Sequence, residues 1–336
     1  MTSPNLRRRR LAQRLASFTA LSSPFARTWA QAPAPPCPCP GICCPTGIVI
    51  PFAPGGTTDY VGRALAKALE HELQTTVVVD NKVGAGGLIG AGAVAQGSKT
   101  GGQALLGTNG ILVASLITPK SLRFATDLQP VAMIGKAPLV LLVPATSSVR
   151  TVQGLLQALK SNPGKLNFAS PGNGSTSHLS ATLLLQSSGT TASHVPYRGT
   201  GPALADVGAG RIDFAFIDIN SAAEAMRQGG VRAIGVSSVS RSNLLPDTPT
   251  VGQQGVAEFE AVEWFGVFVQ SSVPAESSMR WRLAISRALN SPDLRSQLAT
   301  RGVIPQALQG EEFGQFVNVQ GSKWNSVIQR GGLKVD

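Results

Sequence analysis

The sequence has 336 residues, of which 43% are hydrophobic and only 14% charged, with 37 glycines. This length exceeds one small domain and predicts two lobes. The formal charge of +11 is concentrated at the N-terminus, because residues 1–32 hold six arginines and no acid and leave 23 basic against 18 acidic residues elsewhere. The other basic residues are scattered with few aromatic residues between them, which argues against nucleic-acid binding.

The segment 1–32 is typical of an export signal. Four arginines precede a mildly apolar stretch, and Ala30-Gln31-Ala32 offers the small residues of a cleavage site. Consecutive arginines before such a stretch also resemble a twin-arginine signal. The apolar stretch is interrupted by Arg14, Pro24 and Arg27, but the pattern still favours export over the alternative, a basic disordered tail. No later run of about 18 apolar residues predicts a transmembrane helix.

All four cysteines, Cys37, Cys39, Cys43 and Cys44, lie in the segment APAPPCPCPGICCPTG. No histidine is near them, and their spacing lacks the paired Cys-x2-Cys units of zinc sites. The density of proline predicts a disordered leader over residues 33–46. We assign these cysteines no chemistry, and we expect neither a metal nor a cofactor.

The segment GIVIPFAPGGTTD (47–59) predicts a strand, a glycine turn and a helix start. A β-branched run stops at Pro51, and the following residues place apolar side chains at helical spacing. We expect Thr57, Thr58 or Asp59 to provide the N-cap of this helix. Free N–H groups and the positive end of a helix favour an anion at such a turn, whereas the alternative is an ordinary tight corner.

Strands and helical patterns alternate along the rest of the chain. The further predicted strands are TTVVVDN (75–81), ALLGTNG (104–110), LQPVAMIG (128–135), APLVLLVP (137–144), LNFAS (166–170), RIDFAFID (211–218), VRAIGVSS (231–238) and EWFGVFVQ (263–270). Helices are expected after the GAGG turn at 84–87, after Thr151 as N-cap, and over most of 274–332. The glycines at 84, 86 and 90 lack the spacing of a dinucleotide fingerprint. The alternation predicts parallel sheets built from βαβ units.

A second glycine turn, PGNGSTS (171–177), follows the strand LNFAS and precedes a helix. It repeats the arrangement at 54–57. If the two turns face each other, their backbone amides can hold one anionic ligand. We expect a side chain at Gly56 or Gly174 to push the backbone off the ligand or to conflict with the backbone dihedral angles.

The motifs PFAPGGTTD, GAGGLIGA, FASPGNGSTSHLS, HVPYRGTGPAL, RS..LPDTPTV and EEF…KW resemble, in the same order, the tripartite tricarboxylate transporter substrate-binding proteins, or Bug family. The resemblance runs from about residue 47 to residue 332. It implies an α/β fold like that of type II periplasmic binding proteins, with two lobes, each with a mainly parallel sheet wrapped by helices, and a ligand cleft between them. The lobes would be 47–137 with 265–336, and 145–260.

The resemblance further implies a periplasmic receptor without enzymatic activity. Its ligand would be a small carboxylated solute, whether a dicarboxylate, a tricarboxylate, an amino acid or an aromatic acid. Its partners would be the membrane subunits of a tripartite tricarboxylate transporter. The expected ligand-binding residues are Phe52, Gly55, Gly56, Thr57, Thr108, Asn109, Ser170, Gly172, Asn173, Gly174, Ser175, Thr176, Tyr197, Arg198, Gly199 and Asp218.

Several roles stay open at this point. Arg198 either pairs with the ligand or braces its own loop, and Asp218 either meets a ligand amino group or caps the next helix. A stand-alone carboxylate sensor is one alternative function. A serine hydrolase using Ser175 and His178 is another, although Ser175 does not lie in a G-x-S-x-G elbow.

Overall fold

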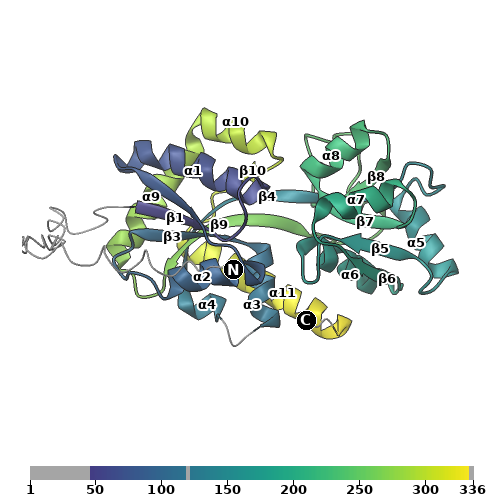
Figure 1. Ribbon diagram of the computed structural model, residues 1–336, viewed down its shortest axis with the longest axis horizontal. Helices are drawn as coiled ribbons and strands as arrows, with labels where there is room; N and C mark the ends of the chain where they lie inside the picture. The colour runs from purple at the N-terminus through teal and green to yellow at the C-terminus, as the bar shows by residue number, and fades with distance from the viewer. Residues whose placement is uncertain (1–45, 119–121, 333–336) are drawn as a thin grey trace, which may run out of the picture. The chain divides into compact units, whose positions relative to one another are not determined.

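The structure is a computed structural model that describes residues 46–118 and 122–332 (Figure 1). The predicted export signal, the four cysteines and the leader up to residue 45 lie outside the described residues. Thr46, which we assigned to the leader, is the first residue of the first strand and is fully buried.

The described chain alternates strands and helices, as predicted. The strands are β1 (Thr46–Ile50), β2 (Val77–Asn81), β3 (Gln103–Thr108), β4 (Leu128–Pro144), β5 (Asn167–Ser170), β6 (Ser193–Pro196), β7 (Phe214–Asp218), β8 (Val231–Val236), β9 (Val262–Gln270) and β10 (Ile304–Pro305). The α-helices are α1 (Thr57–Leu73), α2 (Leu88–Ala95), α3 (Asn109–Ile117), α4 (Phe124–Asp127), α5 (Val152–Ser161), α6 (Thr176–Ser188), α7 (Thr200–Gly208), α8 (Ile219–Arg227), α9 (Ala275–Asn290), α10 (Pro292–Thr300) and α11 (Gly310–Gly331). Two short 3₁₀ turns, η1 (Ala85–Gly87) and η2 (Gly252–Gln254), complete the series.

The fold has two lobes of α/β structure that share strand β4. The hydrogen-bonded path of strands is β2-β1-β3-β9-β4-β7-β5-β6, with β8 and β10 also paired to β4. The pairs within β2-β1-β3 and within β6-β5-β7 are parallel, as βαβ units require. The pairs made by β4 and β9 are antiparallel. Each lobe is therefore parallel in the part that carries a glycine turn.

Strand β4 corrects the prediction of two separate strands over LQPVAMIG and APLVLLVP. It is one strand of 17 residues. Its first part, Leu128–Pro138, pairs with β9, and its last part, from Leu139, pairs with β7 and β8. Its pairing with β9 is regular across Lys136, where the two predicted strands were separated, and the register shifts lie earlier, at Pro130/Ala132 and Met133/Gly135. Figure 1 shows β4 and β9 running between the two groups of elements. The residue limits predicted for the lobes stay a prediction.

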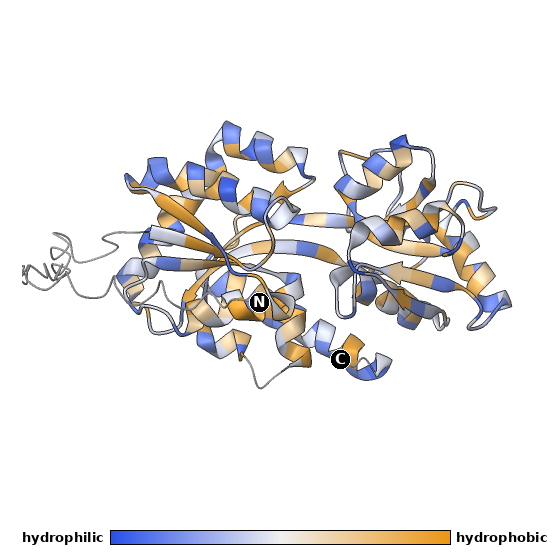
Figure 2. Cartoon of the chain, viewed as in Figure 1, coloured by the Kyte–Doolittle hydropathy of each residue, from blue (hydrophilic) through white to orange (hydrophobic). Residues whose placement is uncertain are grey.

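Each lobe has its own apolar core. Ile48, Leu65 and Trp281 belong to a cluster between α1, α9 and the first sheet, and Leu179 and Phe214 belong to a cluster under α5 and α6. Figure 2 shows the strands as largely hydrophobic, whereas the outer helices alternate hydrophilic and hydrophobic residues. In the part of the chain that the structure describes, no helix combines the length and apolar character needed to cross a bilayer.

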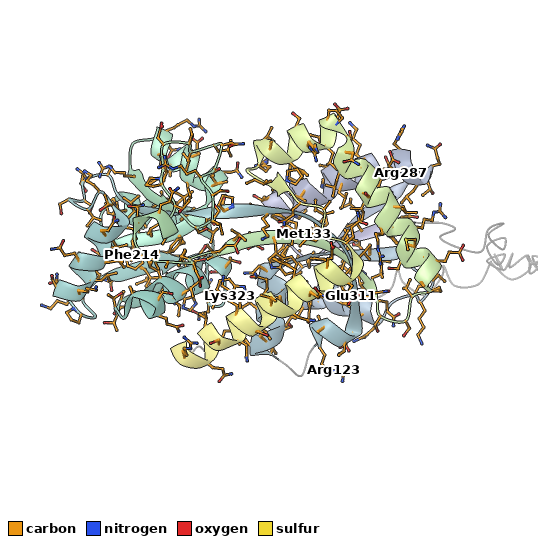
Figure 3. The ribbon with its side chains drawn as sticks, turned by 180° about the vertical axis from the view of Figure 1, so that it is seen from behind. Arg123, Met133, Phe214, Arg287, Glu311 and Lys323 are labelled. Carbon is orange, nitrogen blue, oxygen red and sulfur yellow. The ribbon has the colours of Figure 1, made fainter. Side chains whose placement is uncertain are left out.

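Helix α11 links the two lobes on the side away from the viewer in Figure 1. It packs on β4, α3 and α6, and Figure 3 shows it running past Met133 from Glu311 to Lys323. Near its start, Phe313 packs against Trp264 of β9. Near its end, the Val327 carbonyl accepts the side-chain amide of Gln186 on α6 at 3.0 Å. The helix therefore contacts elements of both lobes.

Candidate ligand-binding site

A cavity of about 900 Å³ lies where the strands of both lobes end and the following helices begin. This is the edge at which open α/β sheets bind ligands. The ends of β3 and β7 and the segment after β1 contribute residues to the wall, as do the glycine turn after β5 and the first turns of α1, α6 and α8. Of the predicted ligand-binding residues, the wall contains Phe52, Thr57, Thr108, Gly172, Asn173, Gly174, Ser175, Thr176 and Asp218.

The starts of two helices contribute residues to the wall of this cavity. Thr57 and Thr58 begin α1, and Thr176 and Ser177 begin α6; all four residues line the wall. The first residues of a helix have no intrahelical acceptor. Within residues 46–118 and 122–332 their N–H groups have no hydrogen-bond partner either. These donors, together with the positive ends of two long helices, form a site suited to an anion.

The first glycine turn is held by Asp59. Its carboxylate accepts the N–H of Gly55 at 3.0 Å, Nε of Arg63 at 2.9 Å and Nδ2 of Asn81 at 2.9 Å. Burial alone would raise the pKa of Asp59, but these hydrogen bonds outweigh it and hold that pKa below its ordinary value. The N-cap of α1 is Gly56, without a side-chain capping bond, so the predicted cap at Thr57, Thr58 or Asp59 is wrong.

The dihedral angles of this turn also correct the role given to Gly56. Gly55 has φ +94°, which requires glycine, whereas Gly56 has φ −78° and open space where a Cβ would lie. In the second turn Gly174 has φ +72°, as the prediction required. The position that needs glycine in the first turn is therefore Gly55.

The second glycine turn uses several of its own donors internally. The N–H of Gly172 binds Oγ of Ser170, the N–H of Gly174 binds Nδ1 of His178, and the N–H of Ser175 binds the Gly172 carbonyl. Ser175 acts as the N-cap of α6, because its hydroxyl oxygen accepts the N–H of His178 at 3.2 Å. The N–H groups of Gly172 and Gly174 are therefore already engaged, whereas those of Thr176 and Ser177 at the helix start are available to a ligand.

Two stacked histidines, His178 and His194, pack beside the second glycine turn and hydrogen-bond to it. The rings of His178 and His194 have centroids 3.7 Å apart, and Phe168 stacks on His194 at 4.8 Å. Nε2 of His194 is 2.7 Å from the hydroxyl of Ser170. Burial lowers the pKa of His178 to about 3, with the neighbouring His194 adding to the shift, and burial lowers the pKa of His194 to about 4. Both rings are therefore neutral near pH 7.

Glu263 is a wall residue that the sequence analysis did not single out. It lies on β9 with its carboxyl between the starts of α3 and α6. Oε2 accepts the hydroxyl of Thr176 at 2.5 Å, and the backbone N–H groups of Asn109 and Gly110 also bind the carboxyl. Burial raises the pKa of Glu263 to about 7, although these hydrogen bonds oppose the shift. A charged residue inside an otherwise apolar strand was the only signal for it in the sequence.

A chain of hydrogen bonds connects Glu263 to both lobes. Nε1 of Trp264 donates to Oδ1 of Asn109 at 3.2 Å, and Nδ2 of Asn109 donates to Oγ1 of Thr176 at 3.2 Å. Thr176 then donates to Glu263. Asn109 was predicted to contact the ligand, but it is fully buried and serves this network instead of the wall.

Arg301 is the second wall residue that sequence reasoning missed. Its guanidinium lies 4.5 Å from the ring centroid of Tyr60, and its backbone carbonyl accepts Nδ2 of Asn220 on α8 at 2.8 Å. Among the described wall residues, Arg301 carries the one cationic side chain. It follows α10, far from both glycine turns in sequence, so no local pattern marked it.

The remaining predicted residues do not reach the wall. Gly55 and Gly56 lie beside it, and Ser170 is fully buried against His194. Tyr197, Arg198 and Gly199 are also absent from the wall; the Tyr197 hydroxyl donates to Asp206 at 2.6 Å, and Arg198 is exposed. Asp218 lines the wall and also caps α8 by accepting the N–H of Ser221 at 3.0 Å.

The site does not present the arrangement of a serine hydrolase. The hydroxyl of Ser175 donates to the Gly172 carbonyl at 2.8 Å, and Nδ1 of His178 accepts the Gly174 N–H. A nucleophile and its base need a direct hydrogen bond between hydroxyl and imidazole. Residues 46–118 and 122–332 also contain no cluster of three or more His, Cys, Asp or Glu side chains that could hold a metal ion.

Comparisons with known proteins agree with this geometry. The sequence profile of the tripartite tricarboxylate transporter family receptor matches residues 61–333. Protein BugT of Bordetella pertussis is 31% identical, with 87% of this chain and 90% of BugT covered. Among solved structures, MatC from Rhodopseudomonas palustris with bound malate has a TM-score of 0.72 and 30% identity, with 84% of this chain and 98% of MatC covered.

A second structure from R. palustris, Rpa4515 with adipate, has a TM-score of 0.75 and 27% identity and covers 86% of this chain and 97% of its own. Sequence and fold therefore agree over nearly the whole described part of the chain. The chain belongs to the tripartite tricarboxylate transporter receptors, the Bug family of solute-binding proteins.

Proposed function

We propose that this protein captures a small carboxylate in the cavity between its lobes, mainly through the N–H groups of Thr57, Thr58, Thr176 and Ser177. The single observation that carries this proposal is the meeting of the α1 and α6 starts, one from each lobe, at one cavity wall. A carboxylate can accept several hydrogen bonds at once, and hydrogen bonds to a charged group are stronger than neutral ones. Arg301 adds a positive charge at the same wall.

The ligands of relatives support a carboxylate of modest size. MatC holds malate and Rpa4515 holds adipate. The wall of this protein also has apolar residues, including Phe52, Leu88 and Phe265, which suit a hydrocarbon body attached to the carboxylate. We infer that the ligand is a mono- or dicarboxylate with an apolar middle part.

The cellular setting follows from the family. We propose that residues 1–32 direct export, in the manner of a twin-arginine signal, and that the mature receptor works in the periplasm with the membrane subunits of a tripartite tricarboxylate transporter. A reporter fused to residues 1–46 tests the first point. It should be exported, and replacing the arginines at 7–10 with glutamine should keep it in the cytoplasm. Export without the arginines would contradict the signal assignment.

A thermal-shift screen over small carboxylic acids tests the binding function. A ligand that binds only the folded protein stabilises it by about 2.7 kcal/mol at a hundredfold excess over Kd. The panel should contain malate, adipate, aromatic acids, and the amides of the same molecules as uncharged controls. We expect stabilisation by at least one acid and none by its amide. Equal stabilisation by acid and amide would contradict an anion site.

A further inference from the structure

Glu263 is an acidic residue in the wall of the cavity that we propose binds a carboxylate. It lies on β9 at the wall, paired across the strands with Ala137 of β4, which is also a wall residue. Its carboxyl accepts the Thr176 hydroxyl and the N–H groups of Asn109 and Gly110. An acid at this place therefore uses part of the same positive field, at the starts of α3 and α6, that would hold a ligand carboxylate.

The charges of the wall make this placement unfavourable for an anionic ligand. Among the described wall residues the ionisable side chains are Asp218, Glu263 and Arg301. With both acids ionised, the wall carries one net negative charge before any ligand enters. A carboxylate bound at Thr176 would then lie close to an ionised Glu263, whose carboxyl accepts the Thr176 hydroxyl. Two carboxylates that share such a site do not both ionise readily, and one of them keeps a proton.

Among the described elements, the neighbours α3, α6 and β4 provide no cation to relieve the repulsion at Glu263. Helix α3 (Asn109–Ile117) has no charged residue. On α6, His178 faces Phe168 and His194.

On β4, Lys136 lies 4.7 Å from the ring centroid of Phe316 and 3.5 Å from Glu260, and Lys323 of α11 donates to the Glu260 carbonyl. These lysines are therefore engaged around Glu260. A proton from solvent can neutralise Glu263 in their place.

We propose that ligand capture is proton-linked at Glu263: the carboxylate binds together with one proton, which lies on Glu263 in the complex and is donated in a hydrogen bond to the ligand. This inference rests on the carboxylate site proposed above. The pKa of Glu263 in the ligand-free protein, raised by burial to about 7, supports it, because a nearby ligand carboxylate raises that pKa further. Near neutral pH, binding then takes up a proton.

Calorimetric titration with adipate tests this proposal. Two buffers with different ionisation enthalpies give the number of protons taken up, and we expect close to one at about pH 8. Adipate itself is fully ionised there, since carboxylic acids titrate near pH 4. The affinity should fall about tenfold between about pH 7.5 and 8.5. Glu263→Gln keeps the shape and the acceptor for Thr176, and it should bind without proton uptake and without this pH dependence.

Asp218→Asn is the matched control, because asparagine can cap α8 and the substitution removes the other acid of the wall. This variant should keep the pH dependence of the wild type. The inference would be overturned if the wild type bound adipate without proton uptake. It would also be overturned if the affinity of Glu263→Gln for adipate depended on pH as steeply as that of the wild type. Either result would leave the carboxylate site intact. If neither adipate nor any acid of the screening panel bound at about pH 6.5, where Glu263 is largely protonated, the site itself and the inference would both be wrong.

Discussion

The backbone N–H of Gly174 donates to Nδ1 of His178, four residues later, at 3.2 Å. The first glycine turn has the same relationship, since the N–H of Gly55 donates to Asp59, also four residues later, at 3.0 Å. In each turn a side chain from the first turn of the helix fixes the glycine loop that precedes it. This arrangement leaves the first N–H groups of α1 and α6 without a partner among the described residues, so that they are available to a ligand.

His178 and His194 should make the protein acid-sensitive. The folded state resists protonation of these rings until about pH 3 and 4, whereas unfolded histidines take up protons near 6.5. The unfolded state therefore binds more protons below pH 6.5. As the pH is lowered below about 6.5, we therefore expect the free energy of unfolding to fall by up to about 1.4 kcal/mol per pH unit for each histidine. Urea unfolding between about pH 7 and 4.5 measures this slope.

His178→Phe removes one titrating ring and keeps an aromatic stack, so its slope should be about half that of the wild type. His71→Gln, at an exposed histidine of α1, is the control variant for the same measurement. A slope as steep in His178→Phe as in the wild type would contradict the assignment.

Backbone geometry separates the two glycines of the first turn. Gly55→Ala should cost about 1–2 kcal/mol of stability, because an L-residue pays this at a positive φ, and it should weaken ligand binding by moving the turn. Gly56→Ala should cost only about 0.5–1 kcal/mol, the effect of a poorer N-cap. Urea unfolding and calorimetry on both variants test this. Equal losses would show that the turn does not depend on the conformation of Gly55.

We expect Asp59 to contribute to stability and ligand binding through the first glycine turn, because its carboxylate accepts the N–H of Gly55. Asp59→Ala frees the N–H of Gly55 and the side chains of Arg63 and Asn81, and we expect a loss of about 1–3 kcal/mol in stability with weaker binding. Asp80→Ala, which removes an exposed ion pair between Asp80 of β2 and Lys82 directly after this strand, is the matched control. It should stay within about 0.5 kcal/mol of the wild type. A loss as large in Asp80→Ala would mean that general charge, not the turn, is responsible.

Arg301 lines the cavity wall and Arg198 does not, so substitutions at the two positions should affect ligand binding differently. Arg301→Ala should lower the affinity for a carboxylate about tenfold or more, which corresponds to about 1.5–3 kcal/mol for a hydrogen bond to a charged group. Arg198→Ala should leave the affinity unchanged, because this side chain is exposed and lies off the wall. Calorimetry at one salt concentration compares them. The reverse ranking would return Arg198 to the role of charge partner.

The sequence was most informative where local chemistry decides the structure. The strand, glycine turn and helix start recur at 46–73 and 167–188, as predicted, because β-branched runs, glycine and hydroxyl residues favour these conformations locally. Thr151 caps α5 by accepting the N–H of Gly154, also as predicted. These features need only neighbouring residues.

The features that sequence reasoning missed depend on distant contacts. Strand β4 stays continuous through Pro138 because β9 pairs with its first part and β7 and β8 with its last part. Glu263 and Arg301 reach the wall only through the packing of β9 and of the segment after α10. In the same way, Gly174 was predicted to offer its N–H to the ligand, but His178 folds back to bind it.

The most direct test of the central claim is amide NMR during titration with a carboxylate found by the screen. We expect the largest changes in amide shift at Thr57, Thr58, Thr176 and Ser177, and no change at the amides of α9 around Met279, a residue that does not line the cavity. Hydrogen bonding by an N–H group to a charged acceptor is the strongest local perturbation available to it. Saturable binding with no change in the amide shifts at both helix starts would show that these N–H groups do not hold the carboxylate.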